Sequence, residues 1–306
     1  MAGIMDDIKY RFNNAPILKQ LIYINVGVYV LVQLVNVVLL LFNRNGMLWL
    51  PYLEVSTHLP TFICRPWTAF TYMFIHHDIW HILFNLLWLY WFGTIFIQYF
   101  SQKHLSTLYI MGGLAGAAMY LLAYNTFPYF ADKEGLMCGA SAAIMAIVFA
   151  TTLRVPDFQV NLLLIGRVSL KYIAAFTIII DLLSMTSPNA GGHFAHIGGA
   201  LMGIAFGWYW NSGKDILRPV IKLIDNIMGG WKRPHIKIKK TKPGATRPKN
   251  GNTRTQSRPE TDGEYLARKK READEIDRLL DKIKKSGYSA LTTEEKQRLF
   301  DAGKKH

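Results

Sequence analysis

Six long apolar runs, separated by short polar segments, occupy the first two thirds of the chain. They fall at about residues 18–42, 80–100, 105–124, 137–153, 169–186 and 193–211. A helix of roughly 17–25 apolar residues crosses a bilayer, so the pattern predicts an all-α, polytopic bundle of six transmembrane helices. The fourth run is the shortest, and we expect its helix to begin below the membrane surface, after a loop that dips inward.

The last third of the chain has a different pattern. Residues 213–231 carry apolar positions on one helical face and predict an amphipathic helix at the membrane interface. Residues 232–262 are rich in Lys, Arg, Pro and Thr and predict a disordered basic linker. Residues 263–306 regain helical periodicity and predict a small helical hairpin with a capping box from Thr292 to Glu295. We therefore expect a membrane domain over 1–212, followed by these three parts.

Charge separates the same two regions. The net charge is +14, and 25 of the 35 Lys and Arg residues follow residue 212. Lys and Arg in the loops of the first region favour one side of the bundle, so the positive-inside rule predicts a multi-pass protein of a plasma (inner) membrane with both termini cytoplasmic. We expect the basic tail to bind anionic lipids of the bilayer and do not expect a nucleic-acid partner.

Polar residues begin three of the apolar runs. His81 and Asn85 open the second run at i, i+4 spacing, Ser141 opens the fourth, and His196 opens the sixth. All three runs start on the same predicted side, so these side chains lie at one depth. Ionisable groups within a membrane usually mark function. Ser141 is a candidate nucleophile and His196 its base, while the backbone N–H of Ser141 and the side chains of His81 and Asn85 can stabilise an oxyanion.

Each of these residues could also have a purely structural role. A lone serine in a membrane helix most often bonds to its own backbone, and a lone histidine near a helix end is usually a packing residue. A metal site is another alternative, with ligands from His77, His81, His193 and His196. No His-Glu-x-x-His motif is present, and Asp78 is the only carboxylate that we expect near these histidines, so the serine interpretation is favoured.

Small residues at four-residue spacing predict that the fourth and sixth helices touch. Gly199, Gly203 and Gly207 follow one stripe of the sixth run, and Ala142 and Ala146 lie on a stripe of the fourth. Such stripes allow close contact between helix backbones in lipid. This contact is required if His196 is to reach the Ser141 hydroxyl. The two cysteines, Cys64 and Cys138, allow one disulfide at most, and we expect unpaired thiols.

Together these motifs resemble one known family, the rhomboid intramembrane serine proteases. The resemblance covers about residues 60–212 and is carried, in order, by Arg65-Pro66-Trp67, His76, His81-Ile82-Leu83-Phe84-Asn85, Gly139-Ala140-Ser141 and Ala195-His196-Ile197-Gly198-Gly199. It implies a six-helix fold and a Ser141–His196 dyad that cleaves single-span transmembrane substrates near their outer membrane boundary.

The resemblance also assigns supporting roles. It implies oxyanion stabilisation by His81 and Asn85 and a site-supporting role for a further group of residues: His76, Arg65, Trp67, Gly139 and Gly199. Residues 43–66 would form a first loop that dips into the membrane. No cofactor and no metal are implied. The alternative within the family is a non-catalytic rhomboid-like protein that binds membrane proteins or acts in their quality control.

Overall fold

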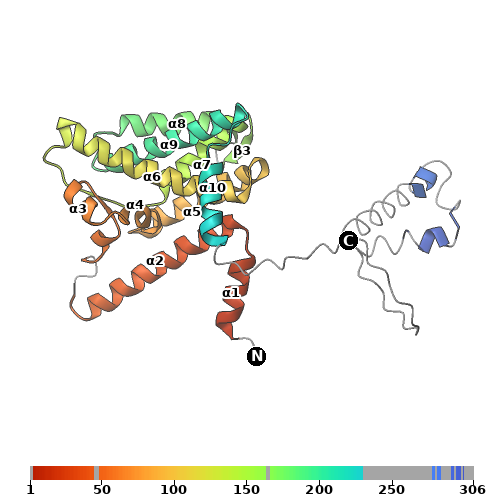
Figure 1. Cartoon of the computed structure of the whole chain (residues 1–306), viewed down its shortest axis with the longest axis horizontal. Coiled ribbons are helices and arrows are strands. Elements are labelled where there is room, and N and C mark those ends of the chain that lie inside the picture. Colours follow the sequence, from red (N-terminus) through yellow and green to blue (C-terminus); the bar gives the residue numbers. More distant parts are fainter. Residues whose placement is uncertain are drawn as a thin grey trace, which may run out of the picture. The chain divides into compact units, whose positions relative to one another are not determined.

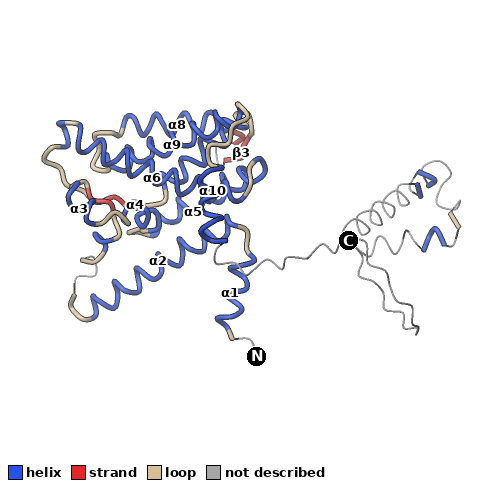
Figure 2. Tube along the Cα trace, in the orientation of Figure 1, coloured by secondary structure: helices blue, strands red, loops and turns tan. Residues whose placement is uncertain are grey.

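The structure is a computed structural model. It describes residues 3–44, 48–162 and 166–229, and in the C-terminal part residues 278–279, 281–283, 291–292, 294–297 and 299. Contacts divide the chain into two compact units, residues 1–235 and 236–306, which are described separately. The first unit is a helical bundle, so the predicted all-α class is confirmed (Figures 1 and 2).

Six helices occupy the six predicted runs. They are α2 (Ile17–Leu41), α5 (Ile79–Tyr99), α6 (Gln102–Thr126), α7 (Ser141–Arg154), α8 (Leu170–Leu183) and α9 (Ala190–Asn211). In the described part of the chain, α2, α5 and α6 are long and apolar enough to cross a membrane, and α7 is a shorter apolar helix. The chain is thus a membrane protein with transmembrane helices, and the count of six crossings stays a prediction.

Helix α7 forms the centre of the bundle. Its residues from Ala142 to Thr152 are all buried. A side-chain carbon added at Gly199 of α9 would overlap the backbone oxygen of Ala142, and one added at Gly203 would overlap that of Ala146. Glycine at these positions therefore lets α9 pack directly on the backbone of α7, as the stripes of small residues predict.

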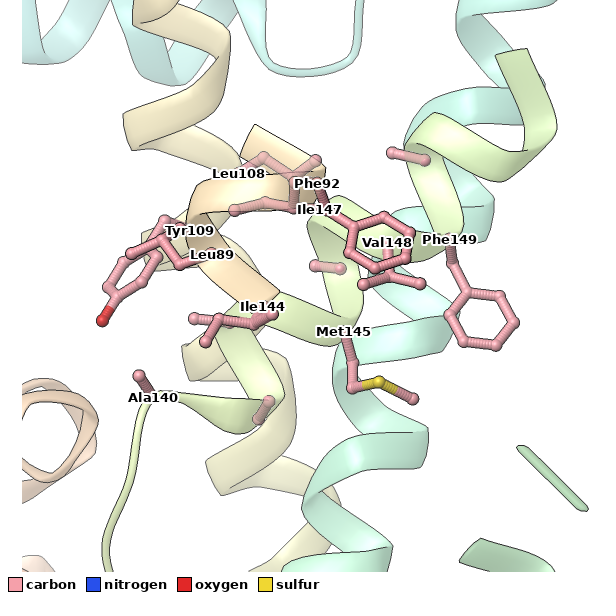
Figure 3. Packing of buried hydrophobic residues seen from close by; sticks show 14 of the residues in the cluster. Leu89, Phe92, Leu108, Tyr109, Ala140, Ile144, Met145, Ile147, Val148 and Phe149 are labelled. Atoms are coloured by element: carbon pink, nitrogen blue, oxygen red, sulfur yellow. The ribbon is translucent and has the colours of Figure 1, made fainter. Parts of the chain in front are cut away.

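Larger apolar side chains fill the other side of α7. Figure 3 shows Leu89 and Phe92 of α5 gathered with Ile144 and Ile147 of α7, and these residues belong to one buried cluster. The outer surface is also apolar, since α2 exposes large side chains such as Leu31 over most of its length. An apolar exterior around an apolar core is expected for a bundle surrounded by lipid.

Short elements connect the helices. Residues 3–16 contain α1 (Ile4–Asn14), and the first loop contains η1 (Leu50–Tyr52), β1 (Val55–Ser56), α3 (Leu59–Cys64), α4 (Thr68–Thr71) and η2 (Tyr72–Phe74). The segment before α7 contains η3 (Pro128–Phe130) and β2 (Leu136–Met137). Strand β1 pairs with β2 in antiparallel register, with Val55 opposite Met137. A hairpin of β3 (Gln159–Leu162) and β4 (Gly166–Ser169) precedes α8. Neither pairing was predicted from the sequence pattern.

The region after α9 begins with α10 (Arg218–Gly229), which lies within the predicted amphipathic segment. Lys103 pairs with Asp225 at 2.6 Å and connects the start of α6 to α10. The predicted linker over 232–262 lies outside the described residues, as does most of the predicted hairpin over 263–306. In the second unit, Thr292 and Glu295 exchange hydrogen bonds between side chain and backbone, so the predicted capping box is confirmed.

Candidate active site

One cavity of about 800 Å³ contains all four of the residues predicted to act in catalysis. His81 and Asn85 of α5, Ser141 of α7 and His196 of α9 line its wall. The side chains are separated by up to 115 positions in the sequence, and they meet because α5, α7 and α9 begin at the same end of the bundle. Cavities of this size are typical of binding sites for small ligands and peptide segments.

Ser141 is the first residue of α7, and the segment before it is held by its backbone. Gly139 has a φ of +117°, a conformation that favours glycine. Its N–H donates to the carbonyl of Tyr72 at 2.9 Å, and the N–H of Ala140 donates to Nε2 of His76 at 3.4 Å. The first hydrogen bond of the helix joins Ile144 N–H to the Ala140 carbonyl, so the N–H of Ser141 has no partner within the helix.

The His81 ring lies against Gly139. A side-chain carbon added at Gly139 would be 2.7 Å from Nε2 of His81 and 3.9 Å from Oγ of Ser141. The space that glycine leaves open is therefore bordered by the predicted nucleophile and by a predicted oxyanion donor. Asn85 is buried, and its Nδ2 donates to the His81 carbonyl at 2.9 Å. An amide nitrogen carries two protons, so one N–H of Asn85 is left for the cavity.

His196 has a partner that the sequence analysis missed. Its Nδ1 lies 2.9 Å from Oδ1 of Asp181, and Nδ1 of His193 lies 2.8 Å from the same oxygen. Asp181 is a buried residue of α8. The expectation that Asp78 is the only carboxylate near these histidines was therefore wrong. Asp78 instead caps α5 and accepts the N–H of His81 at 2.8 Å. The available signal was a single carboxylate within the apolar run of α8.

The contact with Asp181 determines which nitrogen of His196 carries the proton. If Asp181 is ionised, it only accepts hydrogen bonds; the hydrogen then lies on Nδ1 of His196, and Nε2 keeps its lone pair. Within the described residues no hydrogen bond joins His196 to Ser141. Such bonds often form only when substrate is bound. The second oxygen of Asp181 is buried and makes no hydrogen bond within the part of the chain that the structure covers.

The predicted supporting residues divide into two groups. His76 is fully buried next to the cavity wall, and burial lowers its pKa to about 4, so the ring is neutral and can accept the Ala140 N–H. Arg65 and Trp67 lie away from the cavity lining. They hold the first loop, since Arg65 donates to the Pro51 carbonyl at 3.3 Å and Trp67 to the Tyr52 carbonyl at 2.8 Å.

The four histidines of the metal hypothesis do not form one group. In the described chain, His193 and His196 cluster with Asp181, whereas His77 clusters with Glu54 and Cys138. His81 belongs to neither cluster. The four-imidazole arrangement that the spacing suggested is therefore wrong. Cys64 and Cys138 are both unpaired, as expected.

Part of the chain matches a known protein family. The Rhomboid domain family matches residues 64–212, a segment that contains every residue of the predicted dyad and oxyanion site. A second match covers residues 260–305, which resemble a family of unknown function (DUF6576). The C-terminal part of the chain is thus a recurrent protein segment whose role is not known.

Curated relatives carry rhomboid names. RHOMBOID-like protein 12, mitochondrial, of Arabidopsis thaliana is 31% identical over 46% of this chain and 45% of its own length. The human Presenilin-associated rhomboid-like protein, mitochondrial, is 25% identical over 54% of this chain and 43% of its own length. Rhomboid protein 1, mitochondrial, of Saccharomyces cerevisiae is 26% identical over 44% of this chain and 39% of its own length. The chain therefore spans less than half the length of these relatives.

These names correct the predicted location. Each of these relatives is named as a mitochondrial protein, which contradicts the plasma (inner) membrane that we expected. The physical reason for the error is that loop charges report the orientation of helices relative to a membrane. They carry no information about which membrane it is.

Proposed function

We propose that this chain, whose residues 64–212 match the Rhomboid domain family, is an intramembrane serine endopeptidase. Its substrates are single-span transmembrane proteins, cleaved near the membrane boundary at which α5, α7 and α9 begin. The observation that carries the proposal is the common cavity of Ser141 and His196, in which Asp181 fixes Nδ1 of the histidine. The named relatives make a mitochondrial membrane the working location.

The proposed reaction starts at Ser141. Nε2 of His196 takes the hydroxyl proton while Oγ bonds to the carbonyl carbon of the scissile peptide. The oxyanion that forms is stabilised by the N–H of Ser141, by His81 and by the second N–H of Asn85. His196 then gives its proton to the leaving amine as the C–N bond breaks, which leaves the acyl group bonded to Oγ of Ser141. A water molecule attacks the acyl-enzyme, and its proton passes through His196 to regenerate the serine.

Asp181 acts in this scheme as a positioning residue. It holds the imidazole by Nδ1, keeps the lone pair on Nε2, and stabilises the positive charge that the ring carries after it takes the serine proton. Because Asp181 and His196 lie on adjacent helices of the bundle, packing of α8 fixes the orientation of the base. The observed contact joins Asp181 to His196, and the proposed reaction extends it to Ser141 when substrate is bound.

The tail is proposed to bind the membrane surface. Helix α10 exposes Leu223 and Ile227, whose side chains are 59% and 64% accessible, and it carries Arg218 and Lys222. An apolar stripe beside basic residues is suited to the boundary between lipid headgroups and tails. The Lys103–Asp225 contact holds this helix beside α6. Anionic lipids are the expected partners of α10 and of the basic residues after it.

A serine-directed fluorophosphonate tests the proposal. We expect it to label the purified protein in detergent at Ser141 and to block cleavage of single-span substrates. Ser141→Ala should abolish both labelling and cleavage, and His196→Ala should abolish cleavage. Ser212→Ala, at the far end of α9, is the matched control and should be labelled like the wild type. Unlabelled wild-type protein, or cleavage that persists in Ser141→Ala and stops with a chelator, would overturn the serine mechanism.

A further inference from the structure

A second cluster of reactive side chains lies outside the proposed dyad. Glu54 comes just before β1, His77 precedes α5, and Cys138 follows β2. Each side chain has one atom that can bind a metal, and these three atoms lie within 4.8 Å of one another. The three residues come from three separate loops, and two of them, His77 and Cys138, also line the cavity that contains Ser141.

Contacts that do not involve these three side chains place their backbones. The pairing of Val55 with Met137 places the preceding Glu54 and the following Cys138 at the same end of the two strands. Gln33 of α2 donates to the backbone carbonyl of His77 at 3.1 Å. The fold therefore places the three side chains close together before any ion binds. Pre-organisation of this kind reduces the cost of binding.

A buried carboxyl group lies against the imidazole of this cluster. Glu54 is only 2% exposed, and its carboxylate contacts Nε2 of His77. A buried carboxylate with a neighbouring thiol is an environment that retains a positive ion. A metal ion bound between the three side chains would supply that charge.

We propose that Glu54, His77 and Cys138 bind a zinc ion or a similar transition metal. Thiolate sulfur, imidazole nitrogen and carboxylate oxygen are the three ligand types of protein zinc sites. Three protein ligands leave one position of a tetrahedral ion for water or another ligand from the cavity. The half-exposed side chain of His77 gives the ion an entry path.

The ion would connect the first loop to the segment that carries the nucleophile. Cys138 is three residues before Ser141 and next to Gly139, whose backbone conformation borders the oxyanion space. Metal binding thus fixes the loop from β2 to α7 against the segment before α5. This role differs from metal catalysis, because the ligands are not the residues that transfer protons in the proposed reaction.

Cobalt(II) distinguishes this site from the cluster of Asp181, His193 and His196, which contains no sulfur. A thiolate bound to Co²⁺ produces a charge-transfer band in the near ultraviolet, and the chain has only two cysteines. We expect the purified full-length protein in detergent to show this band on titration with Co²⁺. Cys138→Ser should remove the band, and Cys64→Ser, at an exposed thiol, should retain it.

The other ligands give a second measurement. His77→Ala and Glu54→Gln should each weaken Co²⁺ binding by at least about tenfold, since loss of a ligand costs more than loss of its outer partner. His193→Ala should leave the band and its midpoint unchanged. The proposal is overturned if the wild type shows no thiolate band at saturating Co²⁺, if the band persists in Cys138→Ser, or if His193→Ala removes it. Cys138→Ser keeps the test decisive if Glu54→Gln fails to fold, because the Cys138 side chain is partly exposed.

Discussion

Replacement of Asp181 by asparagine measures how much the carboxylate contributes to the proposed reaction. The two side chains have nearly the same shape, so the change keeps the packing of α8 and removes the charge. Oδ1 of Asp181 lies 2.9 Å from Nδ1 of His196 and 2.8 Å from Nδ1 of His193. A hydrogen bond to a charged partner contributes roughly 1.5–3 kcal/mol. If this energy orients the base, kcat should fall by about 10- to 200-fold.

The assay separates positioning from a structural effect. Steady-state cleavage should show a lower kcat with little change in KM, because Asp181 acts through His196 and not on the substrate. Asp181→Glu should recover part of the rate, since it restores a carboxylate acceptor. His193→Ala is the matched control: it removes the other donor to the same oxygen and should cost less than Asp181→Asn.

Two results would refute the reasoning. A kcat for Asp181→Asn within twofold of the wild type would mean that His196 does not depend on the carboxylate. A lower kcat accompanied by a clearly lower unfolding temperature would mean that Asp181 stabilises the fold and does not orient His196. Unfolding of each purified variant in the same detergent therefore accompanies the kinetics.

Two further predictions concern the oxyanion space and the helix contact. His81→Ala and Asn85→Ala should each lower kcat by roughly 10²–10³ at most, the usual loss for one donor, and unchanged turnover in both would remove them from the site. Gly199→Ala should lower the free energy of unfolding by about 1–3 kcal/mol, because the added carbon overlaps the α7 backbone. Gly27→Ala, where no atom lies within 4 Å, should leave stability unchanged or raised; equal unfolding temperatures for the two variants would contradict the packing argument.

The sequence predicts the helices well because each depends on a local property. Long apolar runs locate α2 and α6 to within a few residues, and Thr292 with Glu295 forms its capping box as expected. The same holds for Gly199, whose place on a stripe of small residues indicates a close contact with α7. The information lies within one turn or one stripe, and it does not depend on distant residues.

What the sequence does not predict are contacts between segments that are far apart. The pairing of Val55 with Met137 joins residues 82 positions apart, and neither strand is long enough to show an alternating pattern. Glu54 and Cys138 meet only as a result of this pairing. Asp181 can be recognised as a charged residue in an apolar run, but the direction in which its side chain points depends on the rotation of α8 relative to α9. Packing of whole helices determines that rotation, and the periodicity of α8 alone does not.

The short length of α8 has a consequence for the surrounding lipid. Its 14 residues rise about 21 Å, whereas the 25 residues of α2 rise about 37 Å. If α8 crosses the bilayer as predicted, the difference in length must be matched by tilting of α2 or by a thinner bilayer beside α8. Phe176 and Ile180, on the cavity side of α8, would then face a thinner membrane than any residue of α2. In the proposed reaction, the thickness of the host membrane, set by acyl-chain length, would then affect how easily a substrate helix reaches Ser141.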